Sequence, residues 1–62
     1  MIVRVSTTLY KASHGKSPRG HGMWAFQIRD DVIWYAALYS KAKAWAVTEA
    51  RAAGTNYVEV LP

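Results

Sequence analysis

The stretch of sequence that decides the fold is residues 40–54, Ser-Lys-Ala-Lys-Ala-Trp-Ala-Val-Thr-Glu-Ala-Arg-Ala-Ala-Gly. Ser40 is a preferred N-cap residue, and Gly54 suits the left-handed position that follows a helix. These two signals predict one helix over residues 41–53. We expect this helix to lie close against a sheet, because its inner face carries small side chains. They are Ala42, Ala46, Ala50 and Ala53, with Val47 beside them.

Upstream of this helix, two segments have the pattern of a strand hairpin. Residues 23–29 alternate, with Trp24, Phe26 and Ile28 on one face, and the following Asp30-Asp31 predicts a tight turn. Residues 32–39, Val-Ile-Trp-Tyr-Ala-Ala-Leu-Tyr, favour a strand at their start but would also fit the beginning of the helix. We predict a strand, because Ser40 marks a separate helix start; the helical alternative stays open.

The two ends of the chain also predict strands. Residues 2–10 are rich in β-branched side chains and alternate with period two, and residues 57–61 alternate again. Between the first two strands, residues 11–22 hold three of the four glycines and predict a long, mobile, basic loop. The expected fold is α+β with element order βββαβ, a three-stranded antiparallel meander plus a further strand with one helix packed on one face. Residues 1–62 form a single domain.

Composition excludes several classes of protein. The chain has no cysteine, which removes disulfides, thiolate metal ligands and a cysteine nucleophile. No apolar stretch approaches the roughly 20 residues that span a bilayer, and the N-terminus has the pattern of a strand rather than of a secretion signal. We therefore expect a cytoplasmic protein without membrane contact.

The order of these elements is similar to the first half of the ribonuclease H-like fold. The resemblance lies in Val5-Ser-Thr-Thr, in the glycine-rich loop that ends Gly20-His-Gly-Met-Trp-Ala-Phe26, and in the hairpin, helix and last strand that follow. Nucleases of that family hold two metal ions with acidic residues in the first strand, early in the helix and at the end of the fourth strand. Those places are occupied here by Thr7-Thr8, by residues 41–43 and by Leu61-Pro62. The resemblance thus implies a truncated core without nuclease activity.

Positive charge is concentrated in the first half of the chain. Residues 1–29 carry five lysines and arginines and no acid, whereas residues 30–62 carry three against four acids, for a net charge of +4. Such a one-sided field attracts nucleic acid or an acidic protein surface. Glycine backbone in the loop can approach phosphate closely, and Trp24 follows as a stacking surface. We predict phosphate contacts from Lys11, His14, Lys16, Arg19, His21 and Arg29.

Catalytic and metal chemistry find little support in the sequence. His14 and His21, together with Asp30 or Asp31, could bind zinc, but loop histidines without a rigid supporting shell are usually exposed or hydrogen-bonded to phosphate. Nothing holds a Ser/His/Asp arrangement in place. We expect no enzyme, no cofactor, no metal and no catalytic residue.

One helix can cover only one face of the sheet, which leaves the other face open. If Trp24, Phe26 and Ile28 face the helix, then the opposite face carries Met23, Ala25, Val32, Trp34 and Leu38. An exposed apolar patch of this kind marks an interaction surface. We predict a partner interface at Met23, Trp34 and Leu38. The partner could be a second copy of this chain. The alternative is a hairpin register shifted by one residue, which would place Trp34 in the core.

These observations favour a non-enzymatic nucleic-acid-binding protein that forms a homodimer. The alternative is a protein-interaction or inhibitor module, of the type carried by phages and mobile elements, that blocks a host protein. The two candidate functions predict different positions of the basic loop relative to the exposed aromatic residues. A basic loop and exposed aromatic residues on one surface favour nucleic acid, whereas opposite surfaces favour a protein partner.

Overall fold

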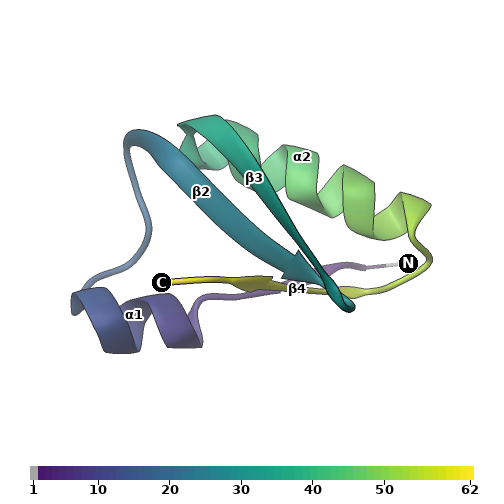
Figure 1. Cartoon of the computed structure of the whole chain (residues 1–62), viewed down its shortest axis with the longest axis horizontal. Coiled ribbons are helices and arrows are strands. Elements are labelled where there is room, and N and C mark those ends of the chain that lie inside the picture. The colour runs from purple at the N-terminus through teal and green to yellow at the C-terminus, as the bar shows by residue number, and fades with distance from the viewer. Residues whose placement is uncertain (1) are drawn as a thin grey trace.

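The computed structural model describes residues 2–62, which form a mixed four-stranded sheet and two helices (Figure 1). The elements are β1 (Arg4–Ser6), α1 (Thr8–His14), β2 (His21–Ile28), β3 (Asp31–Leu38), α2 (Tyr39–Ala52) and β4 (Tyr57–Val60). The expected α+β class, with one helix packed on a sheet, is confirmed. The structure also corrects several details of the expected strands and loop.

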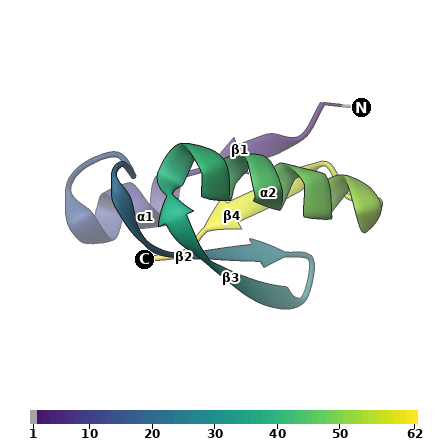
Figure 2. The same ribbon diagram turned by 90° about the horizontal axis from the view of Figure 1, so that it is seen from above.

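The strand order is β1-β4-β2-β3, so the last strand lies inside the sheet (Figure 2). β4 is parallel to β1 and antiparallel to β2. The predicted meander of the first three strands is therefore wrong in one respect, because β1 does not pair with β2. Only the β2–β3 hairpin is a local antiparallel pair, and β1 joins the sheet through a non-local parallel pairing.

The first predicted strand ends early and is followed by a helix. β1 stops at Ser6, and the segment expected to be strand and loop forms α1 instead. The backbone N–H of Lys11 donates to the carbonyl of Thr7 (2.9 Å), and that of Gly15 to Lys11 (2.8 Å). Gly15 has a φ of 72°, which ends the helix. The loop is thus reduced to residues 15–20, and Pro18 within it is buried.

The hairpin has the predicted faces, although its turn lies one residue earlier. Ile28 pairs with Asp31, so the turn consists of Arg29 and Asp30, and Trp34 lies opposite Ala25. Arg29 adopts a φ of 56°, in the region that favours glycine. Residues 32–38 belong to β3, which excludes the helical alternative for this segment.

The core lies between the sheet and α2. Ala42, Ala46 and Ala50 are fully buried against Phe26, Val58 and Val60, as the small-residue stripe predicted. The predicted helix boundaries shift slightly: α2 begins at Tyr39 with Leu38 as its N-cap, so Ser40 is not the cap, and Ala53 is exposed.

The C-terminal end of α2 is closed by a Schellman motif. Gly54 has a φ of 77°, its N–H donates to the carbonyl of Arg51 (3.1 Å), and the N–H of Thr55 donates to that of Ala50 (3.0 Å). The prediction that Gly54 follows the helix is therefore confirmed.

Among residues 2–62, no helix has the length and apolar character required to cross a membrane.

Candidate functional site

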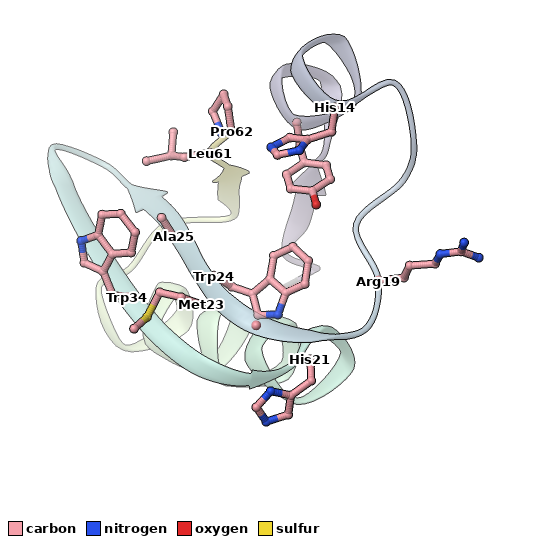
Figure 3. Close-up of a pocket in the computed structure, with 11 residues that line it drawn as sticks. His14, Arg19, His21, Met23, Trp24, Ala25, Trp34, Leu61 and Pro62 are labelled. Atoms are coloured by element: carbon pink, nitrogen blue, oxygen red, sulfur yellow. The ribbon is translucent and has the colours of Figure 1, made fainter.

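A groove of about 370 Å³ opens along the first half of β2, where residues from both faces of that strand line it. Figure 3 shows it between two walls: His14 of α1 with Leu61 and Pro62 on one side, and Met23 and Trp34 of the hairpin on the other. Three separate parts of the chain therefore build it. The C-terminal wall is held to the hairpin by a hydrogen bond from the N–H of Leu61 to the carbonyl of Ala25 (3.0 Å).

A row of aromatic rings connects the groove with the core. His14 stacks on Tyr10 one helical turn earlier, with ring centroids 4.0 Å apart and planes at 15°. Tyr10 lies 5.6 Å from Trp24, which meets Tyr39 edge to face at 5.0 Å. Trp24 is further fixed by a hydrogen bond from its Nε1–H to the carbonyl of Ala37 (3.0 Å). The position of α1 beside the groove thus depends on packed rings.

The ring of Tyr39 lies at the far end of this aromatic row. Burial raises the pKa of the Tyr39 phenol above its usual value, because desolvation disfavours the phenolate.

The open side of the hairpin carries the apolar residues that the alternation predicted. Met23 and Trp34 are each 63% exposed and Leu38 is 47% exposed. Met23 and Trp34 line the groove, whereas Leu38 lies beyond it on the same face of β3. Two of the three predicted interface residues therefore line the same groove as three of the predicted phosphate-binding residues.

Those predicted phosphate-binding residues divide into three groups. His14, Arg19 and His21 border the groove, although the side chain of Arg19 extends away from its centre in Figure 3. Lys11 on α1 and Lys16 in the loop are close to these residues in the sequence and are exposed, but they do not line the groove.

Arg29 belongs to neither of these groups, because it lies at the hairpin turn. The turn is separated from His21 by the length of β2, about 25 Å at roughly 3.3 Å per residue. Arg29 borders a separate hollow of about 350 Å³, lined also by Leu9, Gln27, Thr55, Tyr57 and Glu59. In that hollow, the hydroxyl of Tyr57 donates to Glu59 Oε1 (2.6 Å).

The residues considered for zinc binding are not brought together. His14 and His21 border the groove, but Asp30 and Asp31 lie at the opposite end of the hairpin. Within residues 2–62, no three histidine or acidic side chains form a group that could hold a metal ion.

Sequence reasoning missed Tyr10, Leu61 and Pro62 as groove residues. Tyr10 and His14 have the four-residue spacing that places two side chains on one helix face, which is a detectable signal once residues 8–14 are taken as helical. Leu61 and Pro62 carry no comparable signal, because their place in the groove follows from the position of β4 inside the sheet.

Comparison with known proteins adds no relative: no family model, no curated protein and no solved structure matches the chain. The resemblance to the ribonuclease H-like fold therefore stays a prediction.

Proposed function

We propose that this chain is a non-enzymatic nucleic-acid-binding protein whose ligand lies in the groove between α1 and the hairpin. The observation that supports this proposal is that exposed ring surface and a cation, Arg19, border the same groove. Trp34 and Met23 offer exposed apolar surface, and Arg19 borders the same groove. Stacking surfaces beside positive charge are the combination by which proteins bind nucleic acid with little sequence preference.

The distribution of charge supports a polyanionic ligand. Among the groove-lining residues of the described chain none is acidic, and Lys11 and Lys16 lie on α1 and on the loop that leads into β2. A phosphate backbone that follows this side would meet three cations, Lys11, Lys16 and Arg19. Arg29 would take part only with a ligand long enough to follow β2 to the hairpin turn.

Salt dependence of binding tests this proposal. Each neutralised phosphate contributes about 0.7 to 0.9 to the slope of log affinity against log salt, so three contacts predict a slope of roughly −2 to −3. The measurement is fluorescence anisotropy with labelled DNA and RNA over a range of salt concentrations. The double variant Lys16→Ala/Arg19→Ala should flatten the slope by about 1.4 to 1.8 without changing the melting temperature, because both side chains are exposed.

A matched control removes the same charge elsewhere. Lys41 and Lys43 are exposed on α2 and do not line the groove, so Lys41→Ala/Lys43→Ala should leave the slope nearly unchanged. If the two double variants flatten the slope equally, binding depends on net charge rather than on the groove. Absence of wild-type binding to both DNA and RNA at low salt would refute the proposal.

The second candidate function is a protein-interaction or inhibitor module. The specific observation in its favour is the exposed apolar side of β3, where Val32 and Leu38 are each 47% exposed outside the groove. Pull-down from cells with and without nuclease treatment separates the two candidates. Partners that survive nuclease treatment favour the protein-interaction module, and partners that are lost favour the nucleic-acid-binding protein.

A further inference from the structure

The groove differs from a surface suited only to phosphate contacts, because much of its lining is apolar. Beside the polar side chains of Tyr10, His14, Arg19 and His21, its walls include Met23, Trp34, Leu61 and Pro62, which offer ring and aliphatic surface. In a duplex the faces of the bases are stacked on one another and only their edges and the backbone are accessible. A lining of this composition therefore matches the faces of unpaired bases.

Ring surfaces lie on both sides of the groove. The indole of Trp34 is 63% exposed on the hairpin wall, and the imidazole of His14, backed by Tyr10, stands on the α1 wall (Figure 3). The His14 ring is held by its stacking on Tyr10, so it does not need to be ordered when a ligand binds. The volume of about 370 Å³ falls within the range of sites that hold small flat molecules.

Charge complementarity selects the occupant among candidates that could cover an apolar groove. A second copy of this chain would bring a second set of the same cations toward Arg19, Lys11 and Lys16. A polyanion meets these cations without repulsion. The occupant that fits both the apolar lining and the surrounding charge is a strand with flat bases and a phosphate backbone.

We propose that the groove binds unpaired nucleotides, with a base stacked on Trp34, and discriminates against paired duplex. This inference rests on the proposed function, and it adds the structural state of the nucleic acid that is recognised. Because the contacts are to base faces rather than to base edges, binding should tolerate changes of sequence.

The test compares a single strand of about twelve nucleotides with its duplex, within the range of site sizes known for single-strand binders. Anisotropy titrations use wild type, Trp34→Ser and the matched control Leu38→Ser, which removes an exposed side chain from the same face of β3 outside the groove. We expect wild type to prefer the single strand about tenfold or more. Trp34→Ser should lose about tenfold in single-strand affinity and none in duplex affinity, and Leu38→Ser should match wild type.

A second measurement on unaltered Trp34 keeps the inference testable if Trp34→Ser does not fold. In the variant Trp45→Phe, the remaining indoles are buried Trp24 and exposed Trp34, so quenching by acrylamide reports on Trp34. Saturation with the single strand should protect this fluorescence from acrylamide, and duplex should not. Protection by neither nucleic acid would overturn the inference.

The outcomes also separate this inference from the proposed function. Equal affinity for single strand and duplex, with no effect of Trp34→Ser, would overturn the preference for unpaired bases and leave nucleic-acid binding intact. Failure of wild type to bind either nucleic acid would overturn both.

Discussion

At the scale of single residues, Ala46 shows how closely α2 approaches the sheet. Its methyl group is fully buried, and any larger or charged side chain would enter the space occupied by the core. We expect Ala46→Asp to unfold the domain, because an unpaired buried carboxylate costs several kcal/mol, a large part of the stability of a small domain. Thermal unfolding followed by circular dichroism measures whether the variant still has a cooperative transition.

The control for this variant lies two residues away on the same helix. Ala44 is exposed on the outer side of α2, so Ala44→Asp should keep a cooperative transition near the wild-type melting temperature. Similar transitions for the two variants would show that the inner face of α2 is not where the structure places it.

At the scale of elements, the β2–β3 turn contains a residue under backbone strain. Arg29 has a φ of 56°, which costs an L-amino acid about 1 to 2 kcal/mol and glycine nothing. Glycine loses more entropy on folding, by roughly 0.5 to 1 kcal/mol. We therefore expect Arg29→Gly to raise stability by up to about 1.5 kcal/mol, equivalent to several degrees in melting temperature for a domain of this size.

Differential scanning calorimetry checks this prediction against Asp30→Gly. Asp30 occupies the other turn position without a positive φ, so its replacement by glycine should lower the melting temperature. A lower melting temperature for Arg29→Gly than for wild type would contradict the expected relief of strain.

Elements defined by local periodicity were predictable from the sequence. Alternation over β2 and β3 gave both faces of the hairpin, and the spacing of small residues in α2 gave its buried side. α1 was not predicted, because β-branched residues extend into its start and favour a strand locally. Partial burial of Tyr10 against Trp24 is available only through tertiary packing, and it overrides this local preference.

At the scale of the whole molecule, individual residues of the candidate site were predictable from the sequence, but their arrangement around one groove was not. The cations near the loop and the open-face residues Met23 and Trp34 each carry a signal in the sequence. The groove that Arg19 shares with Met23 and Trp34 depends on α1 and on the segment after β4, which are positioned by the non-local pairing of β1 with β4. Arg29 was assigned to the same site because of its charge, although a strand over residues 23–29 already separates it from the loop by roughly 20 Å.

The two expected uses of Trp34 predict opposite responses to salt. Self-association through Met23 and Trp34 would bring like charges together and should strengthen as salt screens them, whereas nucleic-acid binding should weaken. Sedimentation velocity over a range of salt should therefore show dimer increasing with salt, and saturating single strand at low salt should give a complex of one protein chain. A dimer that persists with bound nucleic acid would show that the two surfaces are separate.

The place of β4 inside the sheet has a consequence for the order in which the strands pair during folding. β1 has its partner strand in β4, and β4 also pairs with β2, so residues 57–60 join the first-made strand to the hairpin. The hairpin can form by local pairing, whereas β1 has no strand to pair with until β4 has joined β2. The N-terminal strand, although it is synthesised first, is then among the last to join the sheet.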